Sequence, residues 1–220
     1  MRRYDLVIFD LDGTLADTRS DLVAAANYTM RALELPEHTP ERVASFVGRG
    51  ATVLLQRALG PEPAEDPERT SRALEIFTRR YREHMLDETR PYPGMPAAIE
   101  RLAAAGVRLC VATNKPGHFT HAMVEALFPG RFAPIVACGG DVPAKPDPAC
   151  IELCLAQHPG VAPERALLVG DSDIDVETAR EAGIDALAVT WGFQPRERLT
   201  GARWIRDRVD EIARIVLEGE

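Results

Sequence analysis

Two aspartates, Asp10 and Asp12, follow the first apolar run of the chain, Leu6–Phe9. A carboxylate is a weak nucleophile in water, but neighbouring cations can position it against a phosphorus centre. A second acid two residues later can protonate the leaving oxygen and then deprotonate the attacking water. Gly13 allows the sharp turn that brings both side chains to one site. The pair therefore favours phosphoryl transfer, with Asp10 as the nucleophile and Asp12 as the acid and base.

Three more aspartates alternate along the chain at Asp171, Asp173 and Asp175, directly after Gly170. Carboxylates at this density repel one another unless a cation or water lies among them. The spacing is similar to that of a calcium-binding EF loop, but the glycine and glutamate that such a loop needs at its sixth and twelfth positions are absent. A hard ion such as Mg²⁺, shared with Asp10, fits the pattern better. Asp173 is expected to be a helix cap or a solvated turn residue.

A phosphate dianion among several carboxylates needs additional positive charge and hydrogen-bond donors. Lys145 is the favoured cation, because prolines near it on both sides restrict the backbone. Thr113 offers a hydroxyl group, and the backbone N–H groups around Asn114 can cradle phosphate oxygens. The role of Lys115 stays open between phosphate binding and a solvated surface position.

The polar clusters stand at or just beyond the ends of short apolar runs, which are typical of strands buried on both faces. The runs are Leu6–Phe9, Val107–Ala112, Pro134–Cys138, Ala166–Val169 and Ala186–Thr190. Helical patterns separate most of them, with helices expected at Pro96–Ala105, from Asp147–Pro148 onwards, and at Glu177–Ala182. Strands that alternate with helices predict an α/β fold with a Rossmann-like parallel sheet. In such a sheet the site lies beyond the carboxyl ends of the strands.

Residues 18–86 interrupt this alternation. No strand pattern occurs there, whereas Asp21–Leu33 and Ala51–Leu59 have helical patterns, and Leu74, Phe77, Tyr81 and Met85 fall on one helical face. Gly60–Pro67 is a polar connection between helices. The block is too long for an ordinary loop between a strand and a helix. We therefore expect an inserted all-helical cap domain at residues 18–86, and an α/β core domain formed by residues 1–17 and 87–220.

The motifs together resemble the haloacid-dehalogenase-like hydrolases. Asp10–Leu15 with Asp17 is similar to the first signature of that family. Thr113, Lys145 and the Gly170–Asp171 pair with Asp175 match the second, third and fourth signatures in the right order. One such motif could arise by chance, but four in order on the expected strand ends make a specific resemblance that covers residues 4 to 195.

The resemblance implies a role for each matched residue. Asp10 would be the nucleophile, and Asp12 would be the acid and base and would also bind the metal through its carbonyl oxygen. Asp171 would be a Mg²⁺ ligand, and Asp175 would be an inner or an outer partner of the ion. Thr113 and Lys145 would hold the phosphoryl group, and the helical insertion would close over the substrate.

Within this family, several segments resemble the phosphoglycolate phosphatase subfamily: Phe46–Ala51, Leu54–Leu59, Thr113–Pro116 and Val189–Phe193. Those phosphatases more often carry asparagine at the position of Arg49. Arg49 could grip a substrate carboxylate with two hydrogen bonds, supported by the backbone N–H groups of Gly48 and Gly50. A solvated Arg49 is the alternative, and both stay open. The substrate that the resemblance implies is a small phosphate monoester, and 2-phosphoglycolate above others.

Four other functions compete with this interpretation. Hydrolytic dehalogenation needs neither Asp12 nor a metal, so the acidic residues argue against it. A phosphomutase would share every residue named and differ in how well the cap excludes water. A pyrophosphatase or nucleotidase could use the same core, because specificity lies in the cap. A catalytically silent binding protein is disfavoured by the intact set of reactive residues.

Composition restricts the partners. The 220-residue chain is 45% hydrophobic with a formal net charge of −8, which is typical of a folded acidic protein. Nucleic acid is not expected as a partner, since its binding needs a basic surface. No segment has the length of a membrane span or a signal-peptide core, which predicts a cytoplasmic protein. The four cysteines lack zinc-site spacing and are expected to be buried or half-buried free thiols. The sequence does not indicate an oligomeric state.

Overall fold

The computed structural model describes residues 2–61 and 66–219. It divides the chain into two compact units. One consists of Met1–Asp17 and Pro91–Glu220, and the other of Thr18–Arg90. The polar Gly60–Pro67 connection lies partly outside the described residues. Within the described residues no helix is both long and apolar enough to cross a membrane.

The first unit is built on a six-stranded sheet in which every paired strand is parallel to its neighbour. The strands lie side by side in the order β5 (Ile135–Ala137), β4 (Arg108–Thr113), β1 (Leu6–Phe9), β6 (Ala166–Gly170), β7 (Asp185–Val189) and β8 (Trp204–Arg206). Each residue of β1 and β6 is buried, because helices cover both faces of the sheet. The predicted α/β fold with a parallel sheet is confirmed.

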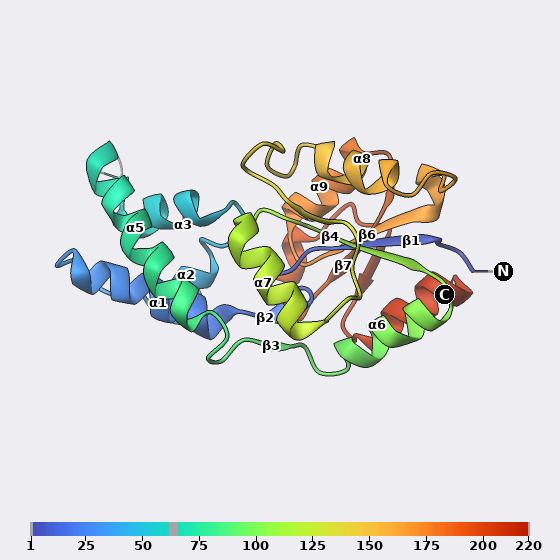
Figure 1. Ribbon diagram of the computed structural model, residues 1–220, viewed down its shortest axis with the longest axis horizontal. Helices are drawn as coiled ribbons and strands as arrows, with labels where there is room; N and C mark the ends of the chain where they lie inside the picture. The colour runs from blue at the N-terminus through green and yellow to red at the C-terminus, as the bar shows by residue number, and fades with distance from the viewer. Residues whose placement is uncertain (1, 62–65, 220) are drawn as a thin grey trace. The chain divides into compact units, whose positions relative to one another are not determined.

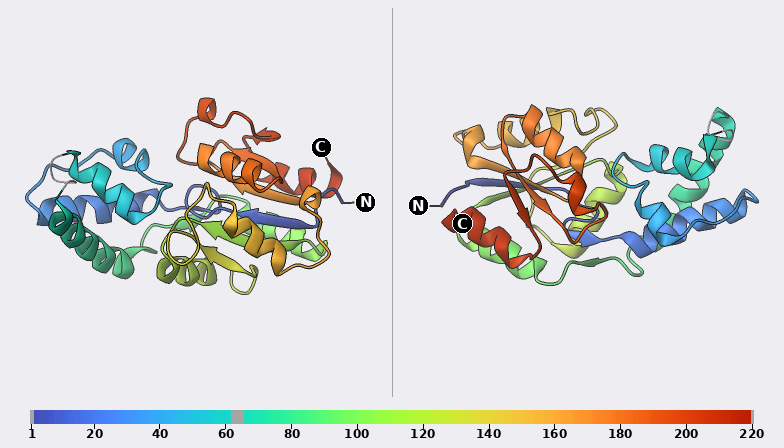
Figure 2. Two further views of the ribbon diagram at one scale, coloured as in Figure 1. Left: turned by 90° about the horizontal axis from the view of Figure 1, so that it is seen from above. Right: turned by 180° about the vertical axis from the view of Figure 1, so that it is seen from behind.

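Helices form a layer on each face of this sheet (Figures 1 and 2). One layer contains α8 (Ala149–Ala156) and α9 (Asp173–Glu181), and the other contains α6 (Met95–Ala104), α7 (Gly117–Leu127) and α10 (Asp210–Glu218). Two single 3₁₀ turns, η1 (Pro163–Arg165) and η2 (Arg196–Arg198), lie in the connections. Alternate residues of β1 join the core under α8 and α9, which also contains all four cysteines. These cysteines are buried and free, as predicted.

The second unit consists of helices and the connections between them in its described residues, apart from Arg90 at its end, which belongs to β3. It contains α1 (Arg19–Ala32), α2 (Pro40–Ala44), α3 (Ala51–Leu59) and α5 (Pro67–His84). Asp66 caps α5 by accepting hydrogen bonds from the backbone of Glu68 and Arg69, and Pro67 occupies the first helical position. Phe77 and Tyr81 stack at 5.4 Å between ring centres and are buried, as the apolar spacing predicts. Strands β2 (Ala16–Asp17) and β3 (Arg90–Pro91) form a separate two-stranded sheet.

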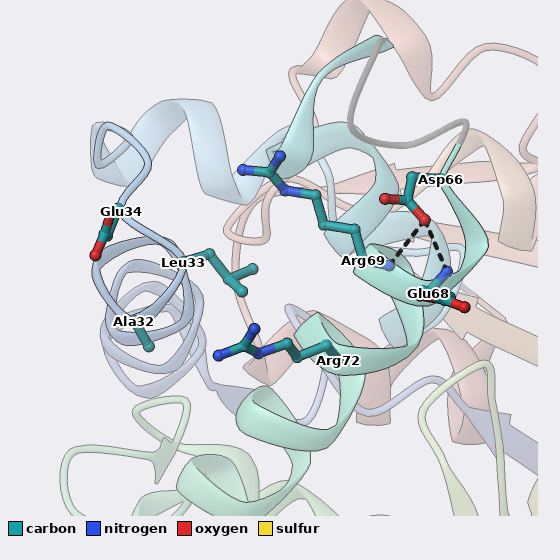
Figure 3. A pocket seen from close by; sticks show the side chains of 7 residues that line it. All are labelled: Ala32, Leu33, Glu34, Asp66, Glu68, Arg69 and Arg72. Atoms are coloured by element: carbon teal, nitrogen blue, oxygen red, sulfur yellow. Dashed lines mark hydrogen bonds between the residues drawn. The ribbon is translucent and has the colours of Figure 1, made fainter.

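A polar hollow of about 490 Å³ lies within the helical unit, beside the C-terminal end of α1 and the N-terminal end of α5 (Figure 3). Its lining residues are Ala32, Leu33, Glu34, Asp66, Glu68, Arg69 and Arg72. None of them belongs to the signature residues, and the Asp66 carboxylate is already used as the cap of α5. The hollow is therefore separate from the residues to which the sequence assigns chemistry.

Three of the differences from the sequence-based expectation have a clear physical reason. Helix α9 begins at Asp173 rather than Glu177, because Ser172 and Asp175 form a capping box at its start. Helix α8 begins at Ala149, with Asp147 accepting a hydrogen bond from the Ala149 backbone at 2.9 Å. Strand β8 was not predicted, since Trp204–Arg206 is half-buried at all three positions and ends in an arginine, so it does not form a continuous apolar run.

Candidate active site

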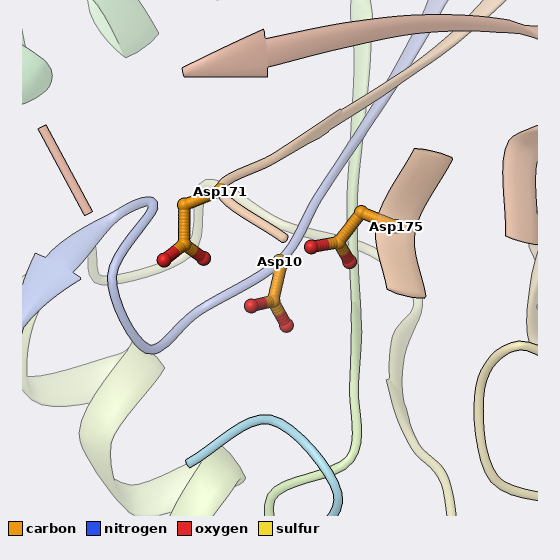
Figure 4. Close-up of side chains that lie close together, drawn as sticks. All are labelled: Asp10, Asp171 and Asp175. Carbon is orange, nitrogen blue, oxygen red and sulfur yellow. The ribbon is translucent and has the colours of Figure 1, made fainter. Parts of the chain in front are cut away.

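Three carboxylates converge at the carboxyl ends of neighbouring strands. Asp10 follows β1, Asp171 follows β6, and Asp175 projects from the first turn of α9 (Figure 4). One oxygen from each lies within 4.8 Å of the others, a spacing at which a single metal ion could be held. Parallel pairing of β1 with β6 brings the ends of these strands together, so residues about 160 positions apart become neighbours.

Two glycines allow the chain to fold tightly around Asp171. Gly13 has a φ of +85°, which side-chain-bearing residues rarely adopt, and a Cβ atom there would overlap the Asp171 carboxylate. A Cβ atom at Gly192 would overlap the same side chain. Both positions therefore need glycine for a reason of space. The requirement at Gly192 was not foreseen from the sequence, because it depends on β7 lying next to β6.

Hydrogen bonds fix the orientation of two of these carboxylates. The Phe193 backbone N–H donates to Asp171 at 2.7 Å, and the Thr14 hydroxyl donates to the other oxygen of Asp171 at 3.3 Å. The backbone N–H of Ser172 donates to Asp175 at 3.1 Å, and the Ser172 hydroxyl donates to the same oxygen at 2.5 Å. These contacts leave the second oxygen of Asp175 to face Lys145.

Lys145 lies between two of the carboxylates. Its Nζ atom donates to Asp10 at 2.9 Å, to Asp175 at 2.7 Å and to the backbone oxygen of Ala112 at 2.9 Å. Burial disfavours the ammonium form, but the charges of Asp10 and Asp175 hold the pKa of Lys145 well above its ordinary value. Lys145 is therefore a fixed positive charge in the position that sequence reasoning favoured for it.

The carboxylates fit a hard divalent cation. Burial raises the pKa of Asp10 to about 6, with Lys145 opposing the shift and Asp175 adding to it. Burial also raises the pKa of Asp171 well above its ordinary value, and Asp10 and Asp175 raise it further. Ionising all three buried carboxyl groups beside one lysine costs free energy, because the negative charges repel one another. A further cation among them would offset this repulsion. An all-oxygen donor set of this kind suits Mg²⁺.

Asp12 has a different partner. Lys115 donates to both of its carboxylate oxygens, at 2.9 and 3.1 Å, and the side chain of Lys115 is only 3% exposed. The sequence left the role of Lys115 open. Its position one residue past Asn114 could have indicated a site residue, since Thr113, at the end of β4, was already assigned to phosphate binding.

The remaining predicted phosphate-binding residues lie at the end of β4 and in the loop that follows it. Thr113 is buried at the end of that strand, and its hydroxyl accepts a hydrogen bond from the Lys115 backbone at 3.3 Å. Asn114 is also buried, and its side-chain amide bonds to the backbone of Lys145. Both therefore belong to the same group of neighbouring loops as Lys145.

The predicted substrate-contacting residues belong to the other unit. Gly48, Arg49 and Gly50 form the connection between α2 and α3, where Arg49 is exposed. Gly48 and Gly50 have φ values of +110° and +84°. Asp173 is half-buried as the first residue of α9 and is not part of the three-carboxylate group.

Comparison with known proteins agrees with this arrangement. A family model described as haloacid dehalogenase-like hydrolase matches residues 7–189. The phosphoglycolate phosphatase of Agrobacterium fabrum is 38% identical over 190 residues, which cover 86% of this chain and 81% of that protein. The phosphoglycolate phosphatase of Escherichia coli K12 is 36% identical over 214 residues, with 88% and 84% covered. The crystal structure of a predicted phosphoglycolate phosphatase from Haemophilus somnus superimposes with a TM-score of 0.90 at 30% identity, covering 98% of this chain and 99% of that one.

Proposed function

The chain belongs to the haloacid dehalogenase-like hydrolases, and we propose that it hydrolyses 2-phosphoglycolate through a phosphoryl group carried on Asp10. Its relatives named phosphoglycolate phosphatase make it a phosphoric monoester hydrolase. The observation that carries the proposal is the convergence of Asp10, Asp171 and Asp175 around one point, with Lys145 in direct contact with Asp10.

In the first step a carboxylate oxygen of Asp10 attacks the phosphorus atom. The new bond joins Asp10 to phosphorus, the bond from phosphorus to the ester oxygen breaks, and Asp12 gives its proton to the departing alkoxide. In the second step a water oxygen attacks the same phosphorus, Asp12 takes the proton of that water, and the bond from phosphorus to Asp10 breaks. Inorganic phosphate leaves, and both carboxyl groups return to their initial state.

Lys145 neutralises charge during both steps. Its ammonium group lies against Asp10, where the phosphoryl oxygens gather as the new bond forms. The Thr113 hydroxyl and the backbone N–H groups around Asn114 supply further donors for these oxygens. Because these groups are buried, their interaction with the developing charge is stronger than it would be in water.

Mg²⁺ is the cation that the proposal assigns to the carboxylates. Asp10 and Asp171 would hold it, together with the backbone oxygen of Asp12, and Asp175 would be a direct or an outer partner. When bound, the ion supplies charge neutralisation that allows an anionic carboxylate to approach an anionic phosphate.

The choice of 2-phosphoglycolate is supported by the names of the relatives and by Arg49. This substrate carries a carboxylate close to its phosphate, and a guanidinium group can hold a carboxylate with two hydrogen bonds. The proposed substrate is therefore a small molecule, and nucleic acid is not expected as a substrate because the chain's formal net charge is −8.

A phosphate-release screen tests this proposal. The panel should contain 2-phosphoglycolate, sugar phosphates, nucleotides, pyrophosphate and p-nitrophenyl phosphate, each with and without Mg²⁺, beside a haloacid as the dehalogenase substrate. We expect Mg²⁺-dependent release with the highest kcat/KM for 2-phosphoglycolate. A preference for sugar phosphates, nucleotides or pyrophosphate would overturn the substrate assignment, and halide release without phosphate release would overturn the reaction class.

A further inference from the structure

The side-chain amide of Asn114 holds the backbone of Lys145 at two points. Its Oδ1 atom accepts a hydrogen bond from the Lys145 N–H at 2.8 Å, and its Nδ2 atom donates to the Lys145 carbonyl oxygen at 3.1 Å. Both residues are buried, with 7% and 4% of their surface exposed. An amide that uses its donor and its acceptor on one residue fixes the position and the rotation of that residue's backbone.

The Lys145 side chain depends on this fixed backbone. Its amine makes three contacts within 2.9 Å, to Asp10, Asp175 and the Ala112 carbonyl oxygen. A flexible four-carbon chain reaches three partners at once only if its Cα atom is well placed. Lys145 lies outside the regular elements, in the connection between β5 and α8, so the strands themselves do not place it.

We propose that Asn114 is a positioning residue for Lys145, acting through its side-chain amide. The inference deepens the proposed function and rests on it, since it assumes that Lys145 assists the reaction at Asp10. The amide links the loop after β4 to the loop before α8, so that the phosphate-binding hydroxyl and the phosphate-binding amine keep a fixed separation. This role is separate from any contact of the Asn114 backbone with phosphate.

The chain contains a matched control for this contact. In the helical unit, Asn27 holds His38 by the same pair of hydrogen bonds, with both distances at 2.9 Å. Asn27 is also buried, and it has no part in the proposed chemistry. Replacing either asparagine by alanine removes two equivalent hydrogen bonds, but only Asn114→Ala releases a residue of the site.

A double-mutant cycle tests the proposal. We would measure kcat, KM and Tm for the wild type, Asn114→Ala, Lys145→Ala, the double variant and Asn27→Ala, with p-nitrophenyl phosphate as substrate. Asn114→Ala should lower kcat by about 100-fold with a smaller change in KM, as expected when a reacting group is displaced by about 1 Å. Asn27→Ala should lower Tm by a similar amount and leave kcat unchanged.

The Lys145→Ala background separates positioning from structural support. The backbone groups that Asn114 binds remain in this variant, so Asn114→Ala should still lower Tm there. It should cause no further loss of kcat, because the amine that it positions is gone. An equal loss of kcat in both backgrounds would overturn the proposal, as would full kcat in Asn114→Ala.

Two further measurements keep the proposal testable if Asn114→Ala does not fold or if the wild type shows no activity. Asn114→Asp keeps the shape and the acceptor but lacks the donor to the Lys145 carbonyl, and it should also lose kcat. Crystal structures of the wild type and Asn114→Ala report the result without any turnover. If the wild type hydrolyses no phosphate ester, the proposed function fails. Positioning is then judged from the structures, and it is refuted if the Lys145 amine keeps its contacts with Asp10 and Asp175 in the variant.

Discussion

Asp10 and the residues around it carry an excess of negative charge. Asp10, Asp171 and Asp175 lie close together, and Lys145 contacts two of them, Asp10 and Asp175, whereas Asp12 is paired with Lys115. A phosphate dianion would add to this excess. This excess of buried negative charge is the reason that a divalent cation is part of the proposal. Because the acids have different partners, replacing each of them should lower activity to a different degree.

The first prediction concerns which acids hold the metal. Removing divalent ions should abolish phosphate release, and adding Mg²⁺ should restore it. Asp171→Ala should raise the Mg²⁺ concentration needed for half-maximal activity at least about tenfold, because the metal loses a ligand. Asp173→Ala is the control, since Asp173 lies outside the three-carboxylate group, and its effect should be mild. An equally severe loss in both variants would show that the ligand assignment is wrong.

The second prediction concerns Asp5, which has no role in the proposed chemistry and accepts hydrogen bonds from two arginines. Hydrogen bonds from Arg165 and Arg2 hold the pKa of Asp5 below its usual range. A lowered pKa in the folded state stabilises the protein above the ordinary carboxyl pKa of about 4, and this contribution is lost as the pH falls towards the folded value. Asp5→Asn should therefore lower Tm at pH 7 by about 2 °C, given the partial exposure of the pair. Thermal melts across the acid range check this, because the difference in Tm should begin to shrink below about pH 4 and continue to shrink as the pH falls towards the folded pKa of Asp5. A difference that stays constant with pH would contradict it.

At the scale of secondary-structure elements, the start of α9 combines stability with function. Ser172 caps the helix through its side chain and also donates to Asp175, whose other oxygen contacts Lys145. The sequence alone predicted a helix from Glu177, with Asp173 as a helix cap or a solvated turn residue before it. The capping box extends the helix back to Asp173 and places Asp175 in its first turn.

The third prediction separates these two roles of Ser172. Ser172→Ala should cost about 1 kcal/mol of stability, the usual loss for an N-cap. It should also lower kcat, because the Asp175 carboxylate loses the donor that orients it. Asp66→Ala is the matched control, as it removes the cap of α5 in the helical unit, and it should lower stability without lowering kcat. Equal kcat in the two variants would mean that Ser172 is only a helix cap.

The elements differ in how well the sequence predicted them. Continuous apolar runs identified β1, β4, β5, β6 and β7, because strands buried on both faces leave an unmistakable pattern. Strand β8, which is half-buried at all three of its positions, gave no continuous apolar run. The close approach of Gly192 to Asp171 and the pairing of Lys115 with Asp12 depend on which strands are neighbours, so no local pattern could indicate them.

At the scale of the whole molecule, the residues that are proposed to carry the chemistry lie in one unit, and the helical insertion forms the other. The signature residues Asp10, Thr113, Lys145 and Asp171 all lie in the α/β unit, whereas Gly48, Arg49 and Gly50 lie in the helical one. The order of the signatures along the chain made the first group predictable. Contact of Gly48, Arg49 and Gly50 with a substrate stays a proposal, because none of these residues belongs to a signature.

The fourth prediction concerns substrate selection by the helical unit. If Arg49 binds the carboxylate of 2-phosphoglycolate, Arg49→Ala should lower kcat/KM for this substrate about 10- to 100-fold, the value of a charge-assisted hydrogen-bonded contact. It should change kcat/KM for p-nitrophenyl phosphate far less, because that ester has no carboxylate. Arg57→Ala, which removes another exposed arginine of the same unit, should affect neither substrate. An equal loss for both substrates in Arg49→Ala would assign Arg49 to closure or folding instead.

The measurement that tests the central claim most directly is the capture of the phosphoryl group on the protein. Enzyme quenched in acid during turnover should yield a peptide that carries one phosphoryl group on Asp10, detected by mass spectrometry. Asp10→Asn should remain folded, show no such peptide and lose several orders of magnitude in kcat, because an amide cannot replace the attacking carboxylate. Full phosphatase activity in Asp10→Asn, or a phosphoryl group found on another residue, would contradict the account.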